Sequence, residues 1–310
     1  MGRPRCEFVD MNDQLSTPQE TRPAGSRIRT VEHESAKGSW RIQFLRPAPS
    51  AASLVHRFCD YSECNTEFVR RREPPAGLAT LVFNLGPALR VQLPDGSGAS
   101  YEAGGAFYCG MSDSFAITET DRAQQGVQVS LTPLGARRLS GFPLGEVGDR
   151  LIDPTDLFGR SARRTTERLQ EANTSEFRLA IIEQEIELAL ARPSRPLAPD
   201  LVWSMRRLRS TSGRISVAAL AEELGCSRKH LSVRFKREFG MAPKLFARVL
   251  RFDLALRGLR SGAVASWAEL ADACGYSDQA HLCRDFTVFA GSPPETFSQR
   301  ALPDEGGFVD

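Results

Sequence analysis

The chain has 310 residues, of which 41% are hydrophobic and 25% charged, with a formal net charge of +2. This length and composition predict about two globular domains of ~100–200 residues, each able to bury a core. No run approaches the ~18 apolar residues that cross a bilayer, and the N-terminus lacks the apolar segment of a secretory signal. We therefore expect a cytoplasmic protein with no membrane partner, whose seven cysteines are reduced thiols.

The hydrophobic pattern of the N-terminal half changes after residue 45. Residues 1–45 are polar and lack sustained periodicity, which predicts a mostly disordered arm. In residues 46–155, short apolar runs such as 78–83 and 106–109 alternate with turns rich in Gly, Pro and Asp. This pattern predicts several short strands in a small β-sandwich or barrel, which would serve as an effector or dimerisation domain.

Residues 156–191 are predicted to be helical. Leu179, Ile182, Ile186 and Ala189 recur at three- and four-residue spacing and form one apolar stripe. The stripe could pack against the β domain or form a dimer interface, and the pattern favours neither. The segment 192–199 contains three prolines, which cannot continue a helix, so we interpret it as an interdomain linker.

Residues 200–300 contain one motif written twice. The chain reads GCSRKHLSVRF at 225–235 and GYSDQAHLCRDF at 275–286. Downstream of each stretch, Gly, Pro and Phe recur at the same spacing, as Gly240, Pro243 and Phe246 and again as Gly291, Pro294 and Phe297. Agreement at so many structurally demanding positions indicates a duplicated unit.

Each unit has the signals of a helix-turn-helix. In the first unit, Gly225 can end one helix in a left-handed turn, and Ser227 can cap the next. Leu231, Phe235 and Phe239 then share one face of that second helix, the element that enters the DNA major groove in this motif. Residues 243–260 are predicted to form one linker helix of roughly 27 Å, able to set two recognition helices in successive grooves.

Charge separates the two units. Residues 201–260 contain fourteen Lys and Arg against four Asp and Glu, whereas residues 261–300 contain two against five. A local basic excess is the footprint of a nucleic-acid surface, although a solvated basic helix face would produce the same count. We expect base choice to come mainly from the first recognition helix.

The residues that carry a family resemblance are the Ala-x3-Gly-x-Ser-x3-Leu core at 221–231, the Phe-x4-Gly-x2-Pro signature in both units, Arg251-x3-Ala255, and 277–281 with Arg284 and Phe286. With these motifs, residues 200–300 resemble the DNA-binding domain of the AraC/XylS family of bacterial transcription regulators. The outward helix faces and the resemblance together assign DNA contact to Arg228, Lys229, Ser232, Val233, Lys236, Gln279, Ala280, Cys283 and Arg284. Ala280 and Cys283 depart from the family pattern, which leads to the hypothesis that the second unit binds weakly or reads shape more than bases.

The front half resembles the sensing domains of such regulators and, more loosely, a cupin-like barrel. A cupin metalloenzyme would need a histidine cluster, and only His33 and His56 precede residue 200. A cysteine methyl acceptor would need a four-cysteine zinc site, and Cys59 and Cys64 are the only close pair. Redox sensing by that pair and a pure dimerisation module without a ligand remain as alternatives.

The combined prediction is an α+β protein, with a small β-sandwich or barrel sensor domain with helices followed by an all-α domain of two helix-turn-helix units and a linker helix. Residues 301–310 would be an acidic tail. We predict a transcription regulator rather than an enzyme, with no cofactor, no metal and no catalytic residue. Its expected partners are double-stranded promoter DNA, RNA polymerase, a small-molecule effector whose binding residues are unknown, and a second copy of the chain.

Overall fold

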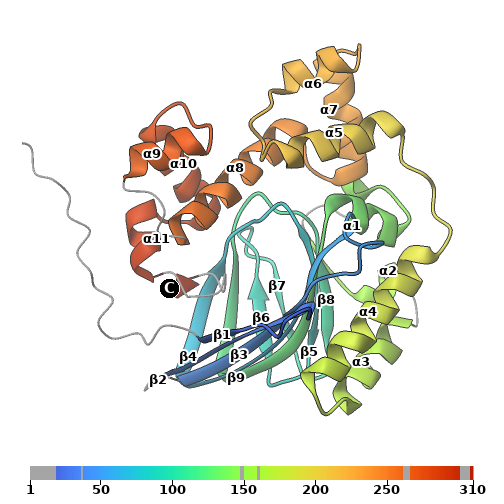
Figure 1. Ribbon diagram of the computed structural model, residues 1–310, viewed down its shortest axis with the longest axis vertical. Helices are drawn as coiled ribbons and strands as arrows, with labels where there is room; N and C mark the ends of the chain where they lie inside the picture. The colour runs from blue at the N-terminus through green and yellow to red at the C-terminus, as the bar shows by residue number, and fades with distance from the viewer. Residues whose placement is uncertain are drawn as a thin grey trace, which may run out of the picture.

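The computed structural model describes residues 19–35, 38–146, 150–158, 161–260, 266–300 and 308–309. Two regions follow one another along the chain. Residues 19–191, here called the β region, form an antiparallel sheet structure with helices at one side. Residues 199–300, here called the helical region, contain helices and no strand where the structure describes them (Figure 1). The predicted fold class is therefore confirmed.

All pairings between the described strands are antiparallel. The order across the sheet is β1-β2-β3-β4-β9-β5-β8-β10, and β6 pairs with both β9 and β7. The strands of the β region are β1 (Gln19–Thr21), β2 (Ile28–Ser35), β3 (Gly38–Leu45), β4 (Val55–Glu73), β5 (Ala79–Asn84), β6 (Leu89–Gln92), β7 (Gly98–Tyr101), β8 (Ala106–Cys109), β9 (Ala116–Leu131) and β10 (Leu151–Ile152).

Two long strands give the β region its curvature. Strand β4 pairs with β9 along most of its 19 residues, with an irregularity between Cys64 and Phe68. Strand β9 then uses residues 126–131 to pair with β5 and residues 117–120 to pair with β6. Because the two halves of β9 serve different neighbours, the sheet folds around a common interior rather than lying flat.

The prediction of a disordered arm over residues 1–45 is wrong for residues 19–45. These residues form β1, β2 and β3, and β3 pairs with β4 from Gly38 to Leu45. The polar residues of β2 and β3 alternate with inward residues such as Val31 and Phe44, which are buried. Residues 1–18 of the predicted arm lie outside the described residues.

The β region also contains five short helical elements. Their bounds are α1 (Pro133–Ser140), η1 (Leu144–Glu146), α2 (Pro154–Phe158), α3 (Ser161–Glu171) and α4 (Ser175–Ala191). Helix α4 buries Leu179, Ile182 and Ile186 in the core of the β region, and Arg178 forms a buried ion pair with Asp60 of β4. The predicted apolar stripe therefore packs against the sheet.

Helix α1 lies within the segment predicted to be β-rich. The Thr132 hydroxyl accepts a hydrogen bond from the Gly135 N–H at 3.1 Å, and Pro133 occupies the first turn. An N-cap Thr followed by Pro is a helix start signal, so this element could have been found from sequence.

The helical region consists of α5 (Pro199–Ser210), α6 (Val217–Glu223), α7 (Arg228–Phe239), α8 (Pro243–Arg260), α9 (Trp267–Ala273), α10 (Gln279–Ala290) and α11 (Pro294–Arg300). Helix α8 has the bounds predicted for the linker helix. Most of the predicted tail 301–310 lies outside the described residues, but β11 (Phe308–Val309) pairs with the end of β4 at Arg71 and Arg72. No helix among the described residues is long and apolar enough to cross a membrane.

The two regions are packed against each other. Met111 and Leu134 of the β region are buried in the core of the helical region. Arg137 of α1, whose side chain is 2% exposed, pairs with Glu238 of α7 at 2.8 Å. At the other unit, Arg72 donates to the Gly291 carbonyl at 2.8 Å. Because apolar and charged contacts reach both helix-turn-helix units, the β region fixes the position of each.

Candidate DNA-binding surface and interdomain cavity

The two helix-turn-helix units are built in the same way and capped differently. In the first, α6 ends at a left-handed Gly225 (φ 62°), and the Ser227 hydroxyl accepts from the His230 N–H at 3.1 Å to start α7. In the second, Gly275 (φ 76°) makes the turn, and the Asp278 carboxylate accepts from the His281 N–H at 2.7 Å to start α10. The predicted Ser227 cap is confirmed, and the second cap carries a negative charge.

The apolar residues of α7 and α10 face inward. Leu231, Phe235 and Phe239 are buried in the first unit, and Leu282 and Phe286 are buried in the second. The opposite faces are left to solvent. The predicted contact residues Arg228, Lys229, Val233, Lys236, Gln279, Ala280 and Arg284 are exposed, and Ser232 and Cys283 are half-buried. All nine are accessible, and their contact with DNA stays a prediction.

Helix α8 holds the units together. Arg248 donates to Asp285 of α10 at 2.6 Å, and Arg251 donates to the Gly213 carbonyl beside α5 at 3.0 Å. Asp285 is 1% exposed, so its charge is compensated inside the core rather than presented to solvent. The outward face of α10 therefore lacks this carboxylate.

A large cavity of about 1110 Å³ lies between the two regions. Its walls are strands of the β region, with apolar residues that include Trp40, Ile42 and Phe107. Leu250 and Leu256 of α8 complete the lining from the helical region. A molecule in this cavity would therefore touch the helix that joins the two DNA-binding units.

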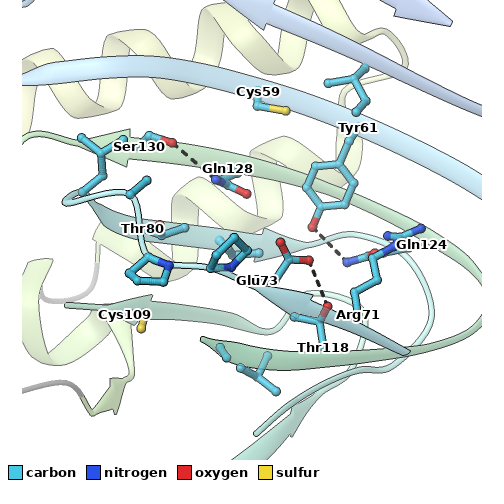
Figure 2. Close-up of a pocket in the computed structure, with 18 of the residues that line it drawn as sticks. Cys59, Tyr61, Arg71, Glu73, Thr80, Cys109, Thr118, Gln124, Gln128 and Ser130 are labelled. Atoms are coloured by element: carbon cyan, nitrogen blue, oxygen red, sulfur yellow. Dashed lines mark hydrogen bonds between the residues drawn. The ribbon is translucent and has the colours of Figure 1, made fainter. Parts of the chain in front are cut away.

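The interior of the cavity carries paired polar groups (Figure 2). Thr118 donates to the Glu73 carboxylate at 3.2 Å, and the Gln124 amide donates to the Tyr61 hydroxyl at 3.3 Å. The Tyr61 ring needs the space beside Gly126, where a Cβ would lie 2.4 Å from its hydroxyl oxygen. A side chain at position 126 would therefore displace Tyr61 from the cavity wall.

Glu73 contributes a carboxyl group to this interior (Figure 2). Burial raises the pKa of Glu73 to about 7, although the Arg71 charge and the Thr118 hydrogen bond act in the opposite direction. Arg71 also pairs with Glu63, since its guanidinium donates to both oxygens of that carboxylate, one of them at 2.7 Å. Burial also raises the pKa of Tyr61, which stays neutral.

The helical region adds charged side chains to the cavity lining. It contributes four arginines, Arg209, Arg257, Arg260 and Arg300. Asp253 of α8 lines the cavity beside them and pairs with Arg257 at 3.0 Å. Burial lowers the pKa of Arg209. The helical side of the cavity is therefore richer in arginine than in acid.

The structure bears on the metal and redox alternatives. His33 and His56 both line the cavity, but within the described ranges no three His, Cys, Asp or Glu side chains are grouped to hold a metal ion. Cys59 and Cys64 lie on the same strand, β4, five residues and thus roughly 16 Å apart. A disulfide needs Cα atoms within ~7 Å, so this pair cannot form one in the folded protein.

The geometry defines a DNA-binding module with two helix-turn-helix units. The family described as "Helix-turn-helix domain" matches residues 220–300. Residues 220–300 are an AraC-type helix-turn-helix domain, a module that binds DNA.

No curated protein sequence matches the chain. Among solved structures, ToxT from Vibrio cholerae is similar at 10% identity over 85% of this chain and 98% of that chain, with a TM-score of 0.45. ToxT bound to (E)-4-(8-methylnaphthalen-1-yl)but-3-enoic acid is similar at 11% identity over 83% of this chain and 98% of that chain, with a TM-score of 0.46. The xylose-binding transcription activator XylR is similar at 17% identity over 44% of this chain and 39% of that chain, with a TM-score of 0.28. Likenesses at this level say nothing about what this chain binds.

Glu73 should make stability depend on pH. The folded protein keeps this proton up to about pH 7, whereas the unfolded chain loses it near 4.5. The stabilising contribution is therefore full below pH 4.5 and lost as pH rises through 7, on the order of 3 kcal/mol in total. Urea unfolding of wild type and Glu73→Gln at several pH values measures it, since every other titrating group is shared. Parallel pH profiles for the two proteins would contradict the assignment.

Proposed function

We propose that the chain regulates transcription by reading a two-box operator at a promoter, with α7 and α10 in successive major grooves. The observation that carries the proposal is the pair of exposed recognition faces on units joined by one helix, α8. Its 18 residues span roughly 27 Å, and successive grooves on one side of DNA lie ~34 Å apart. RNA polymerase is the protein partner that a regulator at a promoter would act on. The proposal assigns the chain no catalytic activity.

The first unit would supply most of the affinity. Arg228, Lys229 and Lys236 are exposed on α7, and Arg237 is exposed beside them. Cations at a recognition helix neutralise phosphates and release counterions, so binding falls steeply with salt. Arg and Lys also pair with the guanine edge in the major groove. The first box should therefore contain guanine.

The cavity would receive a small-molecule effector. Its apolar walls, hydrogen-bonding groups and the arginines of the helical region fit a molecule with an apolar body and an anionic group. Because Leu250, Arg257 and Arg260 of α8 line the same cavity, a ligand there would directly contact the helix that joins the two units. Effector binding could then change the spacing or freedom of the recognition helices without a separate relay.

A second copy of the chain would pair through α4. This helix buries one apolar face in the β region, yet Phe177 and Leu188 on the other face are 66% and 57% exposed. The two are eleven residues apart, about three turns, so they lie on one line along the helix. In a two-fold antiparallel pair, Phe177 would meet the partner's Leu188, which makes the surface self-complementary.

The DNA reading is tested with the full chain by selecting bound fragments from a genomic library. We expect one motif with two boxes about a helical turn apart. Replacing Arg228 and Lys229 together by Ala should weaken binding to that motif by 10-fold or more and reduce its salt dependence. Replacing Arg163 and Arg164 of α3 by Ala removes the same charge from the β region and should change little. No enrichment of any motif would refute the proposal.

The effector site is tested by thermal shift with medium-chain carboxylates and their methyl esters. Binding to the folded state alone raises the melting temperature, so the carboxylates should stabilise the protein and the esters should do so less. Thr80→Trp, which places an indole ring inside the cavity, should reduce the shift. Ala52→Trp, at an exposed turn outside the cavity, should preserve it. An equal shift in the wild type and both variants would contradict the cavity site.

The dimer is tested by sedimentation at micromolar concentration. Phe177→Glu combined with Leu188→Glu should convert the dimer to a monomer, because four charges would be buried at the interface. Val288→Glu changes an exposed valine of α10 outside α4 and should leave the dimer intact. Wild-type protein that sediments as a monomer would refute the α4 interface.

A further inference from the structure

The two recognition helices present different chemistry at equivalent positions. Lys229 of α7 corresponds to Ala280 of α10, and Lys236 corresponds to Thr287. Both Ala280 and Thr287 are exposed, as their lysine counterparts are. Arg284 is the one cation within α10. The second helix thus keeps the fold of the first but has fewer cations, and it presents Gln279 and Arg284 as exposed hydrogen-bonding side chains.

Three other residues on this face of α10 present few polar atoms. The Thr287 hydroxyl donates to the Cys283 carbonyl of its own helix at 3.0 Å, which leaves the methyl group to face outward. Burial raises the pKa of the Cys283 thiol, so the group is neutral and only weakly polar. Ala280, Cys283 and Thr287 therefore form a line of small apolar groups at three- and four-residue spacing, here called the α10 stripe.

The start of α10 is also poorly suited to phosphate. Asp278 caps the helix with a carboxylate that accepts from the His281 N–H and from the Ser277 hydroxyl at 3.1 Å. These hydrogen bonds hold the pKa of Asp278 below its usual value, so it is charged at neutral pH. A negative cap repels phosphate from the positive dipole end of α10, whereas the Ser227 cap of α7 is neutral. Affinity in this groove must come from another source.

We propose that α10 reads the C5-methyl groups of thymines through the α10 stripe, so that thymine methyls specify the second box together with the hydrogen-bonding groups of Gln279 and Arg284. Small apolar side chains recognise the thymine methyl, which is the only apolar group on a base edge in the major groove. The inference rests on the proposed function, because it requires α10 to lie in that groove. The β region touches the opposite end of the helix, at Gly291, and leaves the stripe uncovered.

The test uses full-length protein and the operator recovered by selection, with thymines replaced one at a time by deoxyuridine, which lacks only the methyl group. In the second box, a substitution at a contacted position should weaken binding about fourfold, the factor that burying one methyl group provides. Deoxyuridine in the first box or between the boxes should change binding by less than twofold.

Thr287→Ser is the matched variant, because serine keeps the hydroxyl that bonds to the Cys283 carbonyl and removes only the methyl group. It should weaken binding to the natural operator about fourfold and lose its response to deoxyuridine at one position. Full additivity of the variant and the base change would overturn the contact. Normal binding with no deoxyuridine effect in the second box, or a second box without thymine, would overturn the inference while leaving the regulator intact. Failure to bind any operator would instead refute the proposed function.

Discussion

Two phenylalanines of α8 hold both DNA-binding units in place. Phe246 packs against Phe235 of α7 with ring centroids 6.2 Å apart, and Phe252 packs against Phe286 and Phe289 of α10 at 5.0 and 5.2 Å. A helix pair of this size cannot bury a core alone, so each unit completes its core by packing against α8. The spacing of the units is then set by the rise of a single helix, and everything proposed about a two-box operator depends on that.

The same helix has a second working face. Leu250, Asp253, Arg257 and Arg260 recur at three- and four-residue spacing and line the cavity, while Phe246, Val249 and Phe252 point into the helical core. A helix covered on both sides carries apolar residues nearly all round. A molecule in the cavity would therefore touch the helix that packs against both recognition helices. The β region also contacts each helix-turn-helix unit separately, through Arg137–Glu238 in the first and Arg72–Gly291 in the second.

Duplication has kept the core and changed the surface. Leu231 and Phe235 recur as Leu282 and Phe286, because the packing against α8 is the same in both units. The outward residues have no such constraint, and there the lysines of one unit correspond to alanine and threonine in the other. A regulator with one charged and one apolar reading face would bind DNA through the first and discriminate through both. The charge difference is a property of the linear chain, whereas the turned-in Thr287 hydroxyl is a property of the folded helix.

The sequence by itself determined the helical region. Its helix starts at Ser227 and Pro243, its turns at Gly225 and Gly275, and its inward Leu and Phe residues are signals that act within a few positions, so the spacing alone predicts the elements and their faces. The β region depended on tertiary structure. Strands β1, β2 and β3 form because β3 pairs with β4, and the local sequence does not predict that pairing. Glu73 lies beside Thr118 because β4 and β9 pair in one register, 45 residues apart along the chain. The cavity itself exists only where α8 covers the open end of that sheet, and a contact between distant segments cannot be read from either segment alone.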